Sequence, residues 1–391
     1  MRFDRRTLLK AGSAGAAMAT VGGRWVGVAE AQDDAIKIGF LTALTGLETI
    51  LGETQLECAQ MAVDEINAAG GVLGRQLTLL VEDDATDPRV TVEKANKLMK
   101  QDQVDVIVGM ITSAERNAAV SVTARAQELV IYPTYYEGGH CEKYLVCTGQ
   151  IPNQSIDPFV PWIFENVGST FYVAGSDYVW PRDTAKALRT TVEAAGGQIL
   201  GEEYFPFGTT DFSSVFNRVR DAQPEVFWTM MAGSDAVAFV KQYASTGLDI
   251  QVCTNGLDEL FGAAVPEIAG TISNQSYFMT LDTPANNAFV DAFQTKFGAD
   301  KRINAISEAT YDAIYLYARA IEEAGSTEVE PVLAALGTVE FDAPQGKVNI
   351  DPENQHMLTN SIIGRADERG MFAIIENFGQ VPPKLEGCKL N

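Results

Sequence analysis

Short β-branched runs alternate with amphipathic stretches along most of the chain, and this alternation restricts the fold more than any other feature. The first strand-like runs are IKIGF, LTLLVED and VDVIVGM. The segments between them, CAQMAVDEINAAGG and VTVEKANKLMKQ, place apolar residues at helical spacing. Strands separated by helices of this length predict a parallel sheet with crossover helices.

A second series of the same kind follows the turn-rich segment TGQIPNQSIDP. Its strand-like and helix-like runs come in turn: TFYVAG, DTAKALRTTVEAAGG, QILGEEYF, FSSVFNRVRDAQ, EVFWTMM and DAVAFVKQYASTG. We therefore expect an α/β fold that contains two successive units of similar size. The length of 391 residues agrees with two domains.

The last third of the chain breaks this rhythm. A long helix is predicted at SEATYDAIYLYARAIEEAG, and the Pro- and Gly-interrupted segment FDAPQGKVNIDPENQ follows it. Two further strand-like runs, SIIGRAD and MFAIIENF, are expected to complete a sheet that begins elsewhere in the chain. The segment YFMTLDTP is a candidate second crossing between the two units.

The amino-terminal residues follow the order of an export signal. Arg5 and Arg6 stand directly before Thr-Leu-Leu-Lys, a Gly- and Ala-rich stretch comes next, and small residues at alternate positions lead to Ala31. This order predicts a twin-arginine signal peptide over residues 1–31 and a periplasmic location. Glycines and Arg24 interrupt the apolar stretch before the roughly 20 residues of a spanning helix, so we expect no membrane insertion.

Charge and cysteine content exclude several classes of partner. The formal net charge of −23 argues against binding to nucleic acid or anionic membranes, because an acidic surface repels both. The five cysteines and two histidines include no C-x-x-C pair, which disfavours a zinc site. Cys141 and Cys147 could form a small disulfide loop in an oxidising compartment. Their pairing stays open here, because connectivity does not follow from one sequence.

Enzymatic activity is not expected. The sequence contains no G-x-S-x-G elbow, no P-loop and no G-x-G-x-x-G motif. His140 and His356 lie in polar loop contexts and are predicted to be surface residues. One strand is followed by an acidic set: Glu82, Asp83, Asp84 and Asp87. An acidic strand exit beside Pro88 explains this set, so we expect neither a metal nor a cofactor.

Several sequence blocks are specific in combination: IKIGFLTALTG, NAAGGVLGRQLTLLVEDDATDP, YPTYYEGG, TGQIPNQ, GSDYVWPRDT, YFMTLDTPANNAFVDAF and FDAPQGKVNIDPENQH. With these blocks the chain resembles the type I periplasmic solute-binding proteins over essentially its whole length after residue 31. Within the branched-chain amino acid receptor superfamily, it is most similar to the urea and short-chain amide receptors.

The resemblance implies two Rossmann-like lobes that are joined by three crossings and hold the ligand in the cleft between them. Carried over by position, residues 35–150 and 282–340 form lobe one, and residues 151–281 and 341–391 form lobe two. The implied function is that of the substrate-binding component of an ABC importer. Hinge closure captures urea or a short-chain amide, and a permease in the inner membrane is the partner.

Two loops of lobe one are candidate ligand contacts. Ser113 follows the strand VDVIVGM and opens a helix, so its hydroxyl and the free N–H groups of the helix reach the cleft edge. Simple N-capping by Ser113 is the alternative. Tyr132 and Thr134 follow the next strand, at the end where open α/β sheets bind ligands. Thr134 matches the ligand-binding hydroxyl of the family.

Two loops of lobe two complete the predicted site. Its residues are Tyr178 and Trp180 after the strand TFYVA, and Gly233, Ser234 and Asp235 after EVFWTMMA. The two aromatic residues match family residues that close over a small ligand, and the second loop contributes backbone contacts in the family. Asp235 begins the next helix, so it either caps that helix or accepts N–H groups of the ligand.

The chain departs from the amide receptors at Ile111 and Trp180, where the amide-sensing branch has tyrosines. An amino-acid receptor on the same fold therefore remains an alternative, with Ser113 and Thr134 on the α-carboxylate. Its α-ammonium needs an acidic partner, for which the sequence offers Asp235, Asp258 and Glu259. A receptor domain that passes its closed form to a membrane sensor is a third possibility.

Overall fold

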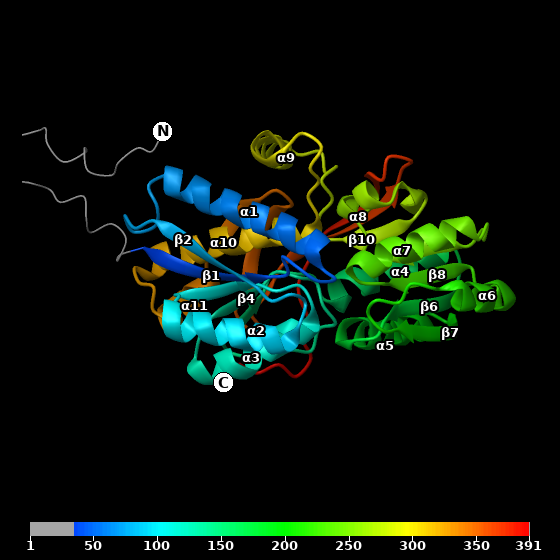
Figure 1. The fold of residues 1–391 in the computed structure, drawn as a ribbon, viewed down its shortest axis with the longest axis horizontal. Coiled ribbons are helices and arrows are strands. Elements are labelled where there is room, and N and C mark those ends of the chain that lie inside the picture. The colour runs from blue at the N-terminus through cyan, green and yellow to red at the C-terminus, as the bar shows by residue number, and fades with distance from the viewer. Residues whose placement is uncertain (1–34, 391) are drawn as a thin grey trace, which may run out of the picture. The chain divides into compact units, whose positions relative to one another are not determined.

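The computed structural model describes residues 35–390 of the chain. In this range strands and helices alternate as the sequence predicts, and they form two α/β lobes that are each built on one sheet (Figure 1). The expected fold class is therefore confirmed. The predicted export signal over residues 1–31 lies outside the described residues.

Lobe one contains an eight-stranded sheet with the order β11-β12-β13-β5-β4-β3-β1-β2. Its strands are β1 (Ile36–Thr42), β2 (Leu77–Asp83), β3 (Val106–Gly109), β4 (Val130–Tyr132), β5 (Leu145–Cys147), β11 (Glu340–Ala343), β12 (Gly346–Asp351) and β13 (His356–Met357). The first five are parallel, and β12 runs antiparallel to both of its neighbours. The helices of this part are α1 (Thr49–Ala68), α2 (Pro88–Lys97), η1 (Leu98–Asp102), α3 (Ser113–Ala126), α9 (Pro284–Phe297), α10 (Ala305–Ala324) and α11 (Val329–Leu336).

Lobe two contains a seven-stranded sheet with the order β15-β14-β10-β9-β8-β6-β7. Its strands are β6 (Thr170–Ser176), β7 (Gln198–Phe205), β8 (Val226–Met230), β9 (Gln251–Thr254), β10 (Ile272–Gln275), β14 (Thr359–Ala366) and β15 (Phe372–Val381). β6 to β10 are parallel, whereas β14 and β15 are antiparallel additions at one edge. The helices are α4 (Pro152–Asn166), α5 (Val179–Ala194), α6 (Ser213–Ala222), α7 (Gly233–Ser245), α8 (Glu259–Ala264) and η2 (Pro266–Ile268).

The chain passes between the two sheets three times. The crossings connect β5 to α4, β10 to α9, and β13 to β14, and the second contains the predicted segment YFMTLDTP. The first crossing is bonded to the start of β14, directly after the third crossing, because Gln150 Nε2 donates a hydrogen bond to the Asn360 carbonyl at 2.7 Å. The connection between the lobes is thus a hydrogen-bonded hinge rather than three independent linkers.

The predicted assignment of residues 341–391 to lobe two is wrong for residues 341–357, which belong to the sheet of lobe one. The segment that reads as Pro- and Gly-broken folds back on itself as a hairpin of β11 and β12, in which Phe341 pairs with Val348. His356 then pairs with Cys147 and attaches the hairpin to the first sheet. Only β14 and β15, which correspond to the predicted strands SIIGRAD and MFAIIENF, extend the second sheet.

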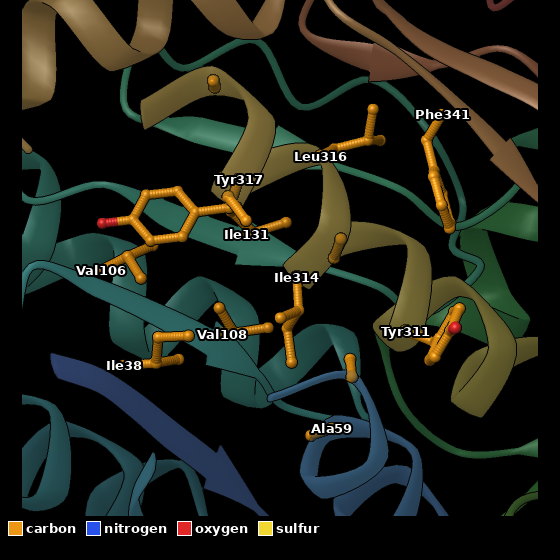
Figure 2. Packing of buried hydrophobic residues seen from close by; sticks show 14 of the residues in the cluster. Ile38, Ala59, Val106, Val108, Ile131, Tyr311, Ile314, Leu316, Tyr317 and Phe341 are labelled. Atoms are coloured by element: carbon orange, nitrogen blue, oxygen red, sulfur yellow. The ribbon is translucent and has the colours of Figure 1, made fainter. Parts of the chain in front are cut away.

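Helix α10 supplies much of the core of lobe one. The side chain of Asn304 caps its start by accepting the N–H of Ser307 at 2.9 Å, and Gly325 ends it in the left-handed conformation at φ 62°. Its buried face packs on the strands: Figure 2 shows Ile314 and Tyr317 of α10 close to Ile38, Val106, Val108 and Ile131. Each fully buried aliphatic side chain contributes about 1.5–3 kcal/mol, so this face fixes α10 on the sheet.

Both sides of β8, an interior strand of lobe two, are covered. All five residues of β8 are buried, as expected for a parallel strand with helices on both faces. Trp228 packs on Phe159 of α4 at 5.5 Å between ring centroids, and Phe227 packs on Phe239 of α7 at 5.6 Å. The alternating directions of side chains along a strand send these two neighbours to opposite layers.

The pairing of Cys141 with Cys147, which the sequence left open, does not occur in the structure. Cys141 is bonded to Cys388 near the carboxyl terminus, 247 residues further along the chain. Cys147 is a free thiol that lies fully buried inside β5. A strand residue in the core of the sheet cannot reach a loop at the surface, and this separates the two cysteines.

The prediction that His356 is a surface residue is also wrong. His356 is buried in β13, where its Nε2 atom lies 2.5 Å from the Tyr136 hydroxyl and its Nδ1 atom lies 2.7 Å from the Asn354 carbonyl. Burial lowers the pKa of His356 to about 4. The ring is therefore neutral at neutral pH and belongs to the core, not the surface.

Candidate functional site

A cleft lies where loops at the carboxyl ends of strands from both sheets meet. Lobe one contributes Glu48, Leu51, Ile111, Ser113, Thr134, Tyr135 and Ile306. Lobe two contributes Tyr178, Trp180, Met231, Ala232, Gly233, Gly256 and Phe261. The volume enclosed between them is about 20 Å³, room for about one water molecule. The lobes are therefore closed on each other in this structure, and only a small guest or a small rearrangement is compatible with the site.

The amino terminus of α3 faces this cleft. Thr112 is the N-cap: its side chain accepts the Glu115 N–H at 3.2 Å, and the Glu115 carboxylate accepts the Thr112 N–H at 2.8 Å. The alternative that Ser113 caps the helix is therefore wrong, and Ser113 is the first helical residue. The first N–H groups of a helix have no partner within it and carry partial positive charge, so this end suits a carbonyl oxygen or a carboxylate.

The hydroxyl of Ser113 is hydrogen-bonded to the buried ion pair of Arg116 and Glu137. Ser113 Oγ donates to Glu137 Oε2 at 2.6 Å, and Arg116 Nη2 lies 2.7 Å from Glu137 Oε1. The Arg116 side chain is 1% exposed, and its guanidinium lies 4.3 Å from the centroid of the Tyr136 ring. The Ser113 proton is donated to Glu137, and the Ser113 oxygen also accepts Arg116 Nη1 at 3.4 Å. One lone pair of this hydroxyl therefore remains as an acceptor for a ligand N–H group.

The residues after β4 divide between the cleft and its back wall. Thr134 lines the cleft and donates its hydroxyl to the Met110 carbonyl at 3.0 Å. Tyr132 does not line the cleft, since it is fully buried with its hydroxyl on the Ile111 carbonyl at 2.8 Å. Tyr135 does line it and reaches across to lobe two, where its hydroxyl donates to the Gly256 carbonyl at 3.3 Å.

Aromatic rings form the lobe-two wall of the cleft. Trp180 is 4% exposed, and its ring centroid lies 5.3 Å from that of Tyr135 and 6.2 Å from that of Tyr178. The indole Nε1 of Trp180 has no hydrogen-bond partner within residues 35–390. The aromatic contacts continue outward to the exposed Phe207, whose ring centroid lies 5.1 Å from that of Tyr178.

Of the three residues predicted after β8, only Gly233 lines the cleft. The N–H of Ser234 donates to the Leu47 carbonyl of lobe one at 3.2 Å, so this residue links the lobes through its backbone. Asp235 is directed to its own lobe, where its carboxylate accepts the Gly208 N–H at 2.9 Å. Asp235 thus fixes the loop that carries Phe207 and does not line the site.

Glu48 is the acidic residue of the cleft, and the sequence reasoning missed it. It lies in the loop between β1 and α1, is 1% exposed, and its Oε2 atom has no partner among the described residues. Burial, and then the nearby carboxylates of Asp235 and Asp84, raise the pKa of Glu48 to about 8. The only signal in the sequence is its position after a predicted strand, which is shared by many loop residues.

Asp258 and Glu259, the other two acidic partners that the sequence offered for an α-ammonium group, do not line the cleft. Asp258 caps α8 by accepting the Leu260 N–H at 3.1 Å, and burial raises its pKa to about 7. Glu259 is buried in the first turn of the same helix. An ammonium group in the cleft would therefore face Glu48.

A larger groove of about 670 Å³ lies elsewhere on lobe two. Its walls include Glu225, Ile250 and Thr271, which directly precede β8, β9 and β10. Open α/β sheets bind ligands at the carboxyl ends of their strands, and this groove lies at the amino ends. We therefore assign the site to the smaller cleft.

Comparison with known families shows which family the chain belongs to. A family model described as a periplasmic binding protein domain matches residues 36–384. The chain belongs to the periplasmic binding protein family. One curated relative is the leucine-, isoleucine-, valine-, threonine- and alanine-binding protein of Pseudomonas aeruginosa, which is 28% identical over 329 residues, covering 81% of this chain and 86% of that protein.

Solved periplasmic binding proteins share the fold at low sequence identity. A solute-binding protein of an ABC transporter from R. palustris, in complex with benzoate, has a TM-score of 0.83 at 20% identity and covers 91% of this chain and 100% of its own. A branched-chain amino acid transporter substrate-binding protein from Streptococcus pneumoniae, in complex with isoleucine, has a TM-score of 0.78 at 22% identity and covers 89% and 100%. These relatives are solute-binding proteins, not enzymes.

Glu82 and Asp83, the acidic residues that end β2, have structural roles in this periplasmic binding protein. Glu82 pairs with Lys94 and Lys97 of α2, and Asp83 accepts the Leu44 N–H at 3.0 Å. Over residues 35–390 no helix is both long and apolar enough to cross a membrane. In the same range no group of three or more potential ligands could hold a metal ion.

Proposed function

We propose that this protein captures a small polar solute between its lobes for an ABC importer, and that urea or a short-chain amide is the solute. The observation that carries the proposal is the pair of groups that face the cleft. Glu48 offers an unpartnered carboxyl oxygen, and the amino terminus of α3 at Ser113 offers N–H donors. An amide can bind both, because its NH₂ donates to the carboxyl oxygen and its carbonyl accepts from the helix N–H groups.

The size and lining of the cleft support a compact, uncharged guest. The enclosed volume of about 20 Å³ holds about one water molecule with the lobes in this position, so every solute requires some separation of the lobes. A compact solute beside the aromatic wall of Tyr178 and Trp180 requires the least. Among residues 35–390, no arginine or lysine lines the cleft. A neutral ligand needs no such countercharge, whereas a carboxylate would depend on the α3 terminus alone.

An amino acid is the second candidate, and the relative from Pseudomonas aeruginosa, named for binding five amino acids, favours it. The α-carboxylate would lie at Ser113 and Thr134, and the α-ammonium would face Glu48. Such a pair requires Glu48 to be ionised, although burial holds its pKa at about 8 in the closed form. The burial that raises this pKa exists only with the lobes closed, so in the open, ligand-free protein Glu48 should be hydrated and ionised near neutral pH. Binding of an amino acid should then cause little net proton change, and closure on an uncharged amide should take up a proton at Glu48.

Isothermal titration calorimetry with urea, acetamide, leucine and benzoate tests this proposal. Titration in two buffers of different ionisation enthalpy measures the protons exchanged on binding. We expect a signal for urea or acetamide with net proton uptake near neutral pH. Leucine binding with no net proton uptake, and without any signal for urea, would favour the amino acid over the amide as the solute. Binding of benzoate alone would contradict both.

We further propose that closure presents the loaded protein to a permease. Solution scattering should show a smaller radius of gyration on addition of the ligand that the calorimetry identifies, because contacts from lobe two favour the closed form. Capture of the ligand-loaded protein by a membrane sensor instead of a permease in a pull-down experiment would favour the receptor-domain alternative.

Export by the twin-arginine route is part of the same proposal, and it rests on Arg5 and Arg6 within residues 1–31. Replacing both arginines by lysine should leave the protein in the cytoplasm on cell fractionation. The control Arg2→Lys should be exported normally. Unchanged export of the double variant would exclude this route.

A further inference from the structure

The carboxyl-terminal segment returns from lobe two to lobe one. β15 forms the edge of the second sheet and ends at Val381. Directly after it, the Pro382 carbonyl accepts a hydrogen bond from Asn153 Nδ2 at 2.9 Å, and the Lys384 N–H donates to Asn153 Oδ1 at 3.0 Å. Asn153 lies in the first turn of α4, so lobe two holds the start of this segment.

The end of the segment belongs to lobe one. Leu385 packs against the buried cluster that includes Tyr136 and Val130. Cys388 is then bonded to Cys141, which lies in the loop between β4 and β5. The disulfide therefore closes a fourth connection between the lobes, in addition to the three crossings of the main chain.

We propose that the Cys141–Cys388 disulfide is a covalent tether that limits how far the cleft opens. The seven residues from Pro382 to Cys388 span the distance between β15 and lobe one, and an extended chain covers at most about 3.6 Å per residue. A segment this short restricts separation of its two attachment points. Without the bond, its contacts with lobe one would be non-covalent, such as the packing of the half-buried Leu385 and the hydrogen bond from Asn354 Nδ2 to the Pro383 carbonyl at 3.5 Å.

The tether also acts on the binding site through one loop. Cys141 lies four residues after Glu137, whose carboxylate accepts the Ser113 hydroxyl and pairs with Arg116. The bond therefore holds in place the loop that orients a cleft residue. This proposal does not depend on the identity of the solute, because it concerns the ligand-free protein.

Distance measurement between the lobes tests the tether. Glu93 on α2 and Lys241 on α7 are exposed, and Glu93→Cys and Lys241→Cys provide one labelling site on each lobe. The natural free thiols Cys58, Cys147 and Cys253 are buried, so a maleimide spin label should react at the introduced positions. Double electron–electron resonance on the ligand-free protein then compares the tethered chain with the variant Cys141→Ser/Cys388→Ser.

We expect the distribution of label distances to broaden and extend to longer values in Cys141→Ser/Cys388→Ser. The control Glu386→Gln changes an exposed residue of the same segment and should give the distribution of the tethered protein. The melting temperature of the double variant should fall by roughly 4–8 °C with an unchanged circular dichroism spectrum.

Identical distributions in the two proteins would overturn the proposal. Peptide mapping that finds Cys141 and Cys388 both as free thiols in protein purified under oxidising conditions would overturn it as well. If Cys141→Ser/Cys388→Ser does not fold, dithiothreitol treatment of the labelled tethered protein provides the same comparison, with the same two outcomes.

Discussion

The Oε2 atom of Glu48 in lobe one lies 2.9 Å from the position that a Cβ atom on Gly233 of lobe two would occupy. The Leu47 carbonyl oxygen lies closer still, at 2.2 Å from that position. Any side chain at Gly233 would therefore overlap the opposite lobe in the closed form, so the closed cleft requires glycine here. This makes Gly233 a test of closure that does not depend on ligand chemistry.

Gly233→Ala should prevent full closure without unfolding either lobe. The new methyl group clashes only when the lobes meet, so we expect affinity for the solute to fall about tenfold or more, with a larger radius of gyration in the presence of ligand. Gly247→Ala is the matched control, because Gly247 also has a positive φ but has no atom within 4 Å of its Cβ position. Both variants should lose about 1–2 kcal/mol of stability from the left-handed backbone. Equal affinities of the two variants would contradict the closure model.

Glu48→Gln should reduce the pH dependence of stability of the closed form. The closed form holds a proton on Glu48 up to its raised pKa of about 8, while the unfolded chain releases it near 4.5. The unfolded state therefore binds fewer protons in this window, and stability falls as the pH rises from about 4.5 to about 8. Glutamine cannot ionise, so the melting temperature of the variant should decline less between these pH values. An equal decline in both proteins would show that Glu48 is not protonated in the closed form.

Arg116→Met should destabilise lobe one strongly. It leaves the carboxylate of Glu137, 7% exposed, without its partner at 2.7 Å, and loss of one member of a buried ion pair costs about 3–5 kcal/mol. Arg116→Met/Glu137→Gln should recover much of this loss. Arg182→Met is the control, since its pair with Asp177 is exposed and should contribute at most about 1 kcal/mol. Unfolding in guanidinium chloride measures these values, because urea is a candidate ligand. Similar losses in Arg116→Met and Arg182→Met would contradict the structural role.

Ser113→Ala should weaken solute binding more than it weakens the fold. The variant removes the cleft hydroxyl and one donor to Glu137, so we expect about 1–2 kcal/mol less stability and a measurable loss of affinity by calorimetry. Ser121→Ala, on the exposed side of the same helix, removes a hydroxyl that donates only to the Ala118 carbonyl. An unchanged affinity in Ser113→Ala would remove this residue from the site.

The architecture could be predicted because its signals are local and repeated. Strand and helix periods alternate through both units, and each run such as VDVIVGM or EVFWTMM became a buried parallel strand. The hairpin of β11 and β12 was not assigned correctly, because the sheet that a strand joins depends on contacts distant in sequence. The pairing of Cys141 with Cys388 escaped prediction for the same reason.

The cleft was predicted where loops follow strands, and the errors concern the direction of side chains. Ser113, Thr134, Tyr178, Trp180 and Gly233 line the cleft as expected. Three other predicted site residues do not line it. Tyr132 lies behind the cleft wall, Ser234 bonds the Leu47 carbonyl through its backbone N–H, and Asp235 faces its own lobe. A position after a strand places the loop at the right edge of the sheet, but it does not decide which way each residue points.

Because Tyr135 and Trp180 are in contact across the cleft, the fluorescence of Trp180 should report whether the lobes are open or closed. The indole belongs to lobe two and the phenol to lobe one, and their rings meet at 5.3 Å only because the lobes are together. Opening the cleft would expose the indole to water and shift its emission to longer wavelength. Trp228 and Trp162 pack on Phe159 within lobe two, so they supply a constant background against which the signal of Trp180 can be read in real time without any attached dye.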